Sequence, residues 1–284
     1  MRQITVRSHA KINWLLRVLG RRDDGYHDIE TIFQSISLHD RITIREAPSL
    51  ELRCDDPSIP AGEQNLVVRA WRALHDRHRI PPVAIDLGKR IPAGGGLGGG
   101  SSNAAATLRA LSRLFALPAD ELPEIALALG SDVPFFLVGG TALGEGRGEM
   151  LEPLPDIAPI PLLLLFPEER VPTGEAFAAL RADGASVRRS DAGRLRRIAG
   201  DPLAAARELT NDFESTVFAR LPRLEELKQM LLERGARWAG MTGSGSTIVG
   251  AFATEPARDA VIAELAAGID AVPAETISRS EALA

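Results

Sequence analysis

Residues 91–106, IPAGGGLGGGSSNAAA, have the composition and spacing of a phosphate-binding loop. Six glycines fall within seven positions, and two serines and an asparagine follow them. Because glycine lacks a Cβ and adopts positive φ without strain, such a loop lets a bulky anion approach backbone N–H groups. A helix that starts after the loop adds unpaired N–H donors and the positive end of its dipole. Ser101, Ser102 and Asn103 suit the cap position of that helix and can offer oxygen or amide groups to phosphate or to a metal ion.

The segments on either side of this loop are a predicted strand and a predicted helix. Residues 83–87 are apolar and β-branched enough for a strand, and residues 104–115 carry leucines at helical spacing. A flexible Gly/Ser linker is the structural alternative, but linkers rarely lie between a strand and a helix without polar padding. The order strand, glycine loop, helix therefore favours a phosphate site.

Two common nucleotide motifs fit this loop poorly. Gly94, Gly96 and Gly99 satisfy the pattern GxGxxG, but a lone match is weak, and no acidic residue that ends a second strand follows at the expected distance. The Walker pattern needs Lys-Ser/Thr directly after its last glycine, whereas Gly100 is followed by two serines. These two patterns therefore do not account for the loop.

The loop resembles the second motif of the GHMP kinases, a superfamily named after galactokinase, homoserine kinase, mevalonate kinase and phosphomevalonate kinase. The shared wording is P-x-G-G-G-L-G-G-G-S-S-N. The resemblance implies that the loop cradles the phosphates of ATP, that Mg²⁺ bridges their oxygens, and that Ser102 is a candidate metal ligand. It also implies that Asn65, which suits a helix N-cap, lies close to the adenine. The implied ATP-binding residues are Asn65, Pro92, Ala93, Gly94, Gly95, Gly96, Leu97, Gly98, Gly99, Gly100, Ser101, Ser102 and Asn103.

Lys11 and Asn13 belong to another predicted strand. In residues 4–14 apolar side chains alternate with polar ones, which places Lys11 and Asn13 side by side on the polar face. Periodicity alone leaves open that this face simply points at water.

Asp132 lies in the sequence GSDVPFF, which also resembles a GHMP kinase segment. An aspartate shortly before a proline suits a helix start, so an N-cap is the structural alternative. The resemblance implies instead that Asp132 and Lys11 are catalytic. Asp132 would accept or orient the proton of the attacking hydroxyl, and Lys11 would keep that carboxylate ionised and stabilise charge on the nucleophilic oxygen.

Residues 20–27, GRRDDGYH, form a predicted turn in which an aromatic residue precedes a histidine. Tyr26 and His27 form either a local staple or a platform that stacks a flat ring and bonds its edge. The turn resembles one branch of the GHMP kinases, whose small-molecule substrate carries a cytidine diphosphate group. Residues 171–177, VPTGEAF, resemble a segment of the same branch, although Phe177 also suits a helix core. The implied substrate-binding residues are Asn13, Tyr26, His27, Thr173 and Phe177.

Two other functions stay open at this point. One is another small-molecule GHMP kinase, of the mevalonate or homoserine type, in which the GRRDDGYH turn would have no nucleobase to bind. The other is a non-catalytic nucleotide-binding regulator, which the presence of both Lys11 and Asp132 disfavours. We therefore expect an ATP-dependent kinase that phosphorylates an alcohol group.

The composition argues against a nucleic-acid or membrane partner. The chain has 284 residues, 45% hydrophobic and 25% charged, with a formal net charge of −5. Cys54 is the single cysteine, so no intramolecular disulfide is possible and a reducing compartment is natural. The first residues lack the apolar core of a signal peptide, and the apolar stretches are too short to span a bilayer. We expect a cytoplasmic protein that is a monomer or a weak homodimer.

The length and the order of elements predict an α+β protein of two domains. Prolines at 153–161 indicate a boundary, which gives an ATP-binding domain at 1–155 and a C-terminal domain at 156–284 with the substrate site at the interface. The resemblance implies a ribosomal-protein-S5-like N-terminal domain and a ferredoxin-like C-terminal domain. Residues 241–252, a second glycine loop, resemble the third GHMP motif, with a hairpin turn as the alternative.

Periodicity and turn signals predict the remaining elements. They are strands at 31–38, 162–166 and 276–278, helices at 65–74, 122–129, 211–231 and 256–267, a turn at 139–148 and an exposed stretch at 181–199.

Overall fold

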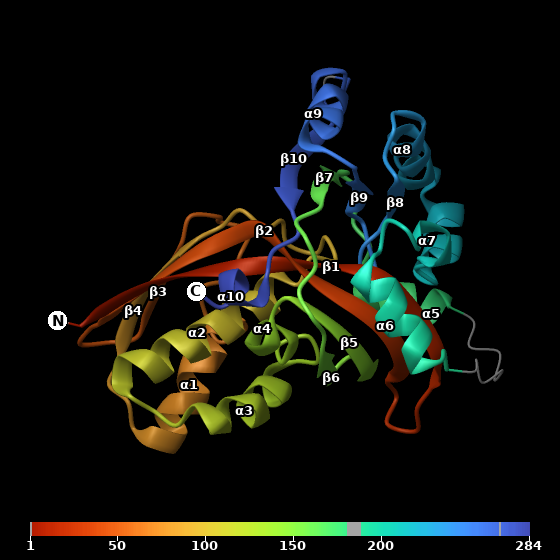
Figure 1. Ribbon diagram of the computed structural model, residues 1–284. Helices are drawn as coiled ribbons and strands as arrows, with labels where there is room; N and C mark the ends of the chain where they lie inside the picture. The colour runs from red at the N-terminus through yellow and green to blue at the C-terminus, as the bar shows by residue number, and fades with distance from the viewer. Residues whose placement is uncertain (1, 181–188, 267) are drawn as a thin grey trace.

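The computed structural model describes residues 2–180, 189–266 and 268–284, in which helices pack against two β-sheets (Figure 1). The larger sheet has the order β3-β4-β2-β5-β6, and β1 pairs with β2. Its neighbours are antiparallel except for β3 and β4, which are parallel. The strands are β1 (Gln3–Arg21), β2 (His27–Glu46), β3 (Glu51–Cys54), β4 (Val83–Gly88), β5 (Thr141–Gly146) and β6 (Met150–Pro153).

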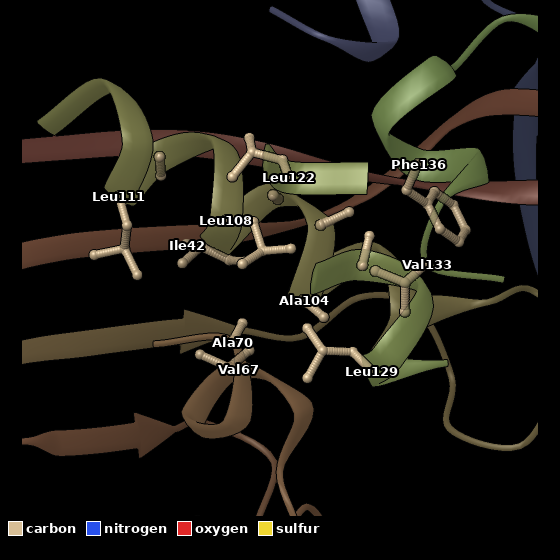
Figure 2. Packing of buried hydrophobic residues seen from close by; sticks show 14 of the residues in the cluster. Ile42, Val67, Ala70, Ala104, Leu108, Leu111, Leu122, Leu129, Val133 and Phe136 are labelled. Atoms are coloured by element: carbon tan, nitrogen blue, oxygen red, sulfur yellow. The ribbon is translucent and has the colours of Figure 1, made fainter. Parts of the chain in front are cut away.

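The helices of the N-terminal half pack against one face of this sheet (Figure 1). Asn65 caps the first of them, since its side-chain oxygen accepts the N–H of Val67 at 2.9 Å. Ala104, Ala105 and Ala106 are buried, and their small side chains let α2 lie close to β1. Figure 2 shows part of this core, to which β2, α1, α2 and α3 contribute side chains; each large one that is fully buried adds about 1.5–3 kcal/mol of transfer free energy. The helices are α1 (Leu66–His78), α2 (Gly99–Phe115), η1 (Ala119–Glu121), α3 (Leu122–Leu129) and α4 (Phe135–Val138).

The smaller sheet has the order β10-β7-β9-β8 and is antiparallel throughout. Its strands are β7 (Pro161–Phe166), β8 (Trp238–Met241), β9 (Ile248–Ala251) and β10 (Asp270–Glu275). The helices of this half are α5 (Thr173–Ala179), α6 (Ala192–Gly200), η2 (Ala206–Glu208), α7 (Phe213–Arg220), α8 (Pro222–Glu233), α9 (Glu255–Ala263) and α10 (Arg279–Ala282). Two sheets with helices around them confirm the α+β prediction. The boundary between residues 155 and 156 stays a prediction; it falls in the connection from β6 to β7.

The long β1–β2 hairpin takes part in both halves of the molecule (Figure 1). On one side of β1, Ala10, Ile12 and Trp14 join a hydrophobic cluster that contains Leu162 and Val249 of the smaller sheet. The hairpin therefore provides the surface on which the second sheet packs. No helix in the described residues is both long and apolar enough to cross a membrane.

Lys11 and Asn13 do not face water, which the alternation of β1 had left open. Their exposed fractions are 3% and 4%. The register of β1 against β2 shifts on both sides of these residues, between His9 and Lys11 and between Asn13 and Leu15. Such irregularities redirect side chains and are frequent next to active sites. Both side chains line a pocket.

The prediction that Ser101, Ser102 and Asn103 cap α2 is wrong. The helix begins at Gly99, and its N-cap is Gly98, whose φ of 70° lies in the left-handed region. The three polar residues therefore lie inside the first turns of α2. The glycines themselves form the start of the helix because Gly98 turns the chain without a Cβ penalty.

The predicted turn at 139–148 is also wrong, because β5 occupies most of it, between β2 and β6. Within this stretch only Gly139, Gly140, Gly146 and Gly148 bend the chain with positive φ. Gly144 has a different purpose, since a Cβ there would lie 2.7 Å from the Phe33 ring. A glycine inside a strand can thus mark close packing instead of a turn.

Four C-terminal predictions need correction. The helix predicted at 211–231 is two helices, because Pro222 disfavours helical geometry at Leu221. The stretch predicted as exposed at 181–199 includes α6, in which Leu195 and Ile198 are buried; residues 181–188 lie outside the described residues.

The strand predicted at 276–278 lies earlier in the chain, because the last strand is β10, which ends at Glu275. Its Pro273 is tolerated because β10 is an edge strand. Helix α9 ends at Ala263, and residue 267 of its predicted span is outside the described part of the chain.

Candidate active site

A pocket of about 1200 Å³ brings together segments that are far apart in the sequence. The glycine loop, the β1–β2 turn, the residues before α1 and α4, helix α5 and the loop after β8 all line it. Every residue that the sequence analysis assigned to the site lies in this lining, apart from Ser102. The volume is that of a site for one or more small molecules.

The absence of side chains at the glycines allows the loop to lie in close contact with neighbouring protein atoms. Gly96 and Gly98 have φ values of 78° and 70°. A Cβ on Gly96 would lie 2.1 Å from the carbonyl oxygen of Thr242, in the loop after β8. One on Gly98 would lie 2.6 Å from the Phe136 ring. At these two positions glycine is required by packing, which the anion-approach argument from the sequence did not foresee.

The first turn of α2 faces the pocket. Gly99, Gly100 and Ser101 line it, and the N–H groups at a helix start lack partners within the helix. These donors and the helix dipole form a candidate anion site. Ser102 is 2% exposed, and its hydroxyl donates to the His9 carbonyl at 2.6 Å. Ser101 is therefore better placed than Ser102 to meet a phosphate or a metal ion.

Asp40 holds both ends of the glycine loop, and the sequence analysis missed it. Its side chain is fully buried, and Asp40 pairs with Ser8 of β1 within the β1–β2 register. One oxygen accepts the N–H groups of Arg90 at 2.6 Å and Ile91 at 2.8 Å, before the loop. The other accepts the side-chain amide of Asn103, after the loop, at 2.8 Å, and pairs with Lys89. A buried carboxylate persists only when its oxygens are satisfied in this way, so the same contacts that stabilise Asp40 fix the loop.

Lys11 and Asp132 meet beside the loop. Lys11 Nζ lies 3.9 Å from Asp132 Oδ2 and donates to Asn13 Oδ1 at 2.6 Å. It also lies 5.6 Å from the centre of the Phe33 ring. The backbone N–H of Lys11 donates to the Leu97 carbonyl at 3.1 Å, which connects the lysine directly to the glycine loop. The structure thus places a cation, a carboxylate and a candidate phosphate site in one pocket.

The electrostatic environments of the two charged groups differ. Burial lowers the pKa of the Lys11 amino group, and the negative charge of Asp132 opposes part of this change. The Asp132 side chain is 37% exposed, so its carboxylate is accessible from the pocket. Capping does not explain this aspartate, because the N-cap of α4 is Pro134 and no side chain bonds to that helix start.

Asn13 joins Lys11 to the second glycine loop. Its Oδ1 accepts the N–H of Gly243 at 3.1 Å in addition to Lys11 Nζ. Its Nδ2 donates to Thr31 Oγ1 at 2.7 Å, and its backbone N–H donates to Thr242 Oγ1 at 3.1 Å. These contacts favour a role in positioning Lys11; contact of Asn13 with a substrate stays a prediction.

Tyr26, His27 and Phe177 line another part of the same pocket. The His27 and Phe177 rings stack with centroids 4.8 Å apart, and Phe177 meets Phe213 edge to face at 4.8 Å. Tyr26 is 52% exposed, with the Arg147 guanidinium 4.5 Å from its ring centre. Burial lowers the pKa of His27, so its ring is neutral near pH 7. Thr173, also in this lining, bonds through its hydroxyl to Ser244 at 3.0 Å.

The two-sheet fold and the glycine loop are those of a kinase of the GHMP class. The family described as "GHMP kinases N terminal domain" matches residues 65–140, and the family described as "GHMP kinases C terminal" matches residues 185–270.

Proteins with similar sequences and structures identify the family within the GHMP class. The 4-diphosphocytidyl-2-C-methyl-D-erythritol kinase of Caldanaerobacter subterraneus subsp. tengcongensis is 40% identical over 254 residues, 88% of each chain. The enzyme of that name from a Synechococcus species is 42% identical over 267 residues, 89% of this chain and 86% of that one. A crystal structure of 4-(cytidine 5'-diphospho)-2C-methyl-D-erythritol kinase matches with a TM-score of 0.81 and 34% identity, over 96% of this chain and 99% of the other. The chain belongs to the 4-diphosphocytidyl-2-C-methyl-D-erythritol kinase family.

Proposed function

We propose that this protein transfers the γ-phosphoryl group of ATP to the 2-hydroxyl of 4-diphosphocytidyl-2-C-methyl-D-erythritol, in non-mevalonate isoprenoid precursor biosynthesis. The observation that carries the proposal is the Lys11–Asp132 pair, which lines the same pocket as the glycine loop and the Tyr26–His27 turn. Relatives that are 40% and 42% identical and bear that enzyme's name support the substrate.

The reaction asks the protein mainly to position groups and to stabilise charge. The 2-hydroxyl oxygen attacks the γ-phosphorus, the bond to the bridging β–γ oxygen breaks, and ADP leaves. Asp132 accepts the hydroxyl proton as it is released. Lys11 stabilises negative charge on the attacking oxygen. The N–H groups of the glycine loop and of the first turn of α2 hold the phosphates of ATP.

Mg²⁺ in this proposal enters with ATP. The described residues contain no group of three or more His, Cys, Asp or Glu side chains placed to hold a metal ion by themselves. The Ser101 hydroxyl, in the pocket lining, is a hard oxygen donor of the kind that Mg²⁺ prefers, and phosphate and water oxygens would complete the shell. When bound, Mg²⁺ neutralises charge on the phosphates.

The proposed activity is tested by incubating the protein with ATP, Mg²⁺ and 4-diphosphocytidyl-methylerythritol, in parallel with mevalonate and with homoserine. ADP release should occur with the cytidine substrate and not at a comparable rate with the others. Comparable turnover of mevalonate or homoserine would contradict the substrate assignment. ATP binding without any turnover would indicate a non-catalytic regulator.

We expect the aromatic end of the pocket to bind the cytosine. Tyr26→Ala should raise KM for the cytidine substrate by the equivalent of about 1–3 kcal/mol, the usual scale for a base stacked on an aromatic ring. The KM for ATP and kcat should change little, because a stack is the same in the ground and transition states. Steady-state kinetics with each substrate varied in turn provide the measurement. An equal rise in KM for ATP and for the cytidine substrate would show that Tyr26 has only a structural role.

His27 and Phe177 need a separate experiment, because His27 covers one face of Phe177. Phe177→Ala should weaken binding of the cytidine substrate, as Tyr26→Ala does. His27→Ala should in addition reduce the preference for cytidine over its uridine analogue, because a lost hydrogen bond to the base edge changes selectivity whereas lost stacking does not. An unchanged preference would exclude His27 from base recognition.

A further inference from the structure

We propose that Arg147 is a positioning residue for the cytidine end of the substrate, acting through Tyr26. Its Cζ lies 4.5 Å from the centre of the Tyr26 ring, and both residues line the pocket. The effect of Arg147 on substrate recognition rests on the proposed function. The contact between Arg147 and the Tyr26 ring does not, because it is present without a substrate.

Tyr26 needs a partner to hold its ring. The backbone around it is fixed: its N–H donates to Asp24 Oδ1 at 3.1 Å, and its carbonyl accepts the N–H of Arg22 at 2.8 Å. The side chain is 52% exposed at the tip of the β1–β2 hairpin. A half-exposed ring is free to rotate, and immobilising such a side chain on binding weakens affinity. A guanidinium over one face restricts that rotation beforehand.

Arg147 is well suited to this task because its own backbone is constrained. It lies in the short turn between β5 and β6, flanked by Gly146 and Gly148, whose φ values are 68° and 102°. Its N–H donates to Glu149 Oε2 at 2.5 Å, and its Nε lies 3.6 Å from Glu149 Oε1. The guanidinium therefore approaches Tyr26 from a turn anchored in the larger sheet.

The contact between Arg147 and Tyr26 also makes the two faces of the tyrosine ring different. A guanidinium stacks on the negative face of an aromatic ring, which is an attractive arrangement for arginine and tyrosine. With one face taken by Arg147, the opposite face is the one offered to a flat base. Arg147 thus selects the orientation in which Tyr26 meets cytosine.

The ring contact can be tested without a substrate, because Tyr26 is the only tyrosine of the chain. Protein labelled with fluorotyrosine should give one fluorine NMR resonance. Arg147→Met keeps an unbranched apolar stem and removes the guanidinium, so it should shift that resonance. Arg196→Met is the matched control, since Arg196 is an exposed arginine paired with Glu152 of β6 at 2.8 Å, and it should leave the resonance in place. A resonance that Arg147→Met does not move would overturn the proposal.

The consequence for recognition is tested by a double-mutant cycle. Arg147→Met should raise KM for the cytidine substrate about 2- to 5-fold, the range for an exposed cation–π contact, with kcat and the KM for ATP unchanged. In the Tyr26→Ala background the same change should have no further effect. An equal loss in that background would mean that Arg147 contacts the substrate directly and would contradict the positioning role. If the wild-type protein does not turn over the cytidine substrate, the proposed function fails, and the fluorine resonance still decides whether Arg147 holds Tyr26.

Discussion

Lys11→Ala and Asp132→Asn should each lower kcat by about 10²-fold or more, while ATP binding survives. The expectation follows from the geometry, since Lys11 Nζ lies 3.9 Å from the Asp132 carboxylate and the Lys11 backbone is bonded to the glycine loop. A proton acceptor and a positive charge next to the attacking oxygen act mainly in the transition state. Their loss should therefore appear in kcat measured with saturating substrates, and calorimetric titration with ATP should change little.

Thermal unfolding separates this prediction from a structural role. Asp132 is 37% exposed and does not cap α4, so the stabilisation that Asp132→Asn should remove is its attraction to buried Lys11, and Tm should fall only slightly. Normal turnover together with a lowered Tm would show that the aspartate is structural. Lys11 is a buried cation, and Lys11→Met, which removes the charge but retains the stem, provides a second variant that should fold if Lys11→Ala does not.

The pH profile supplies an independent check of the pair. Burial lowers the pKa of Lys11, and Asp132 raises it in part. Asp132→Asn removes the raising charge, so the pKa of Lys11 falls further and the lysine loses its proton at a lower pH as the solution becomes alkaline. The residual activity of Asp132→Asn should therefore decline at a lower pH than the wild-type activity. An alkaline limb that does not move would indicate that the two groups are not coupled.

The sequence predicted the fold class because its signals were local. Apolar periodicity, the cap at Asn65 and the strand–loop–helix order around the glycines are properties of short segments. The errors arose where one local signal has two physical causes. Gly144 lies in a predicted turn but makes room for Phe33 within β5, and the asparagine and serines after the glycine loop suit a helix cap but lie inside the first turns of α2.

The candidate site was predictable where residue types carry chemistry and resemble a known motif. Lys11, Asp132, the glycine loop and the Tyr26–His27 turn all line one pocket. Asp40 and Arg147 were missed because each acts through contacts with residues distant in the sequence. Asp40 follows the predicted strand at 31–38, where an aspartate looks like any polar surface residue, and its burial arises only when the segment after β4 and helix α2 pack over it.

The last prediction concerns the junction of the two glycine loops. Gly96→Ala should destabilise the protein by about 3 kcal/mol or more and lower kcat/KM by about 10²-fold or more. Two effects add: an alanine at a φ of 78° is strained by about 1–2 kcal/mol, and its Cβ would lie 2.1 Å from the Thr242 carbonyl oxygen, a backbone atom that cannot rotate away. The loops would have to separate, and the bonds from Lys11 to Leu97 and from Asn13 to Gly243 lie at this junction.

The matched control is Gly100→Ala in the same loop. A Cβ at Gly100 would make an ordinary contact, 3.7 Å from Leu66 Cδ1, and Gly100 is not among the glycines with positive φ. Because alanine restricts the unfolded chain and favours a helix, this variant should keep or raise Tm, by the equivalent of about 0.4–1 kcal/mol. Thermal unfolding of both variants, with kcat/KM for Gly96→Ala, provides the measurement. If Gly96→Ala matched Gly100→Ala in Tm and retained its activity, the close contact between the glycine loops would not be what aligns Lys11. A lowered Tm with unchanged kcat/KM would assign the contact to stability alone, since catalysis would then tolerate the separation of the loops.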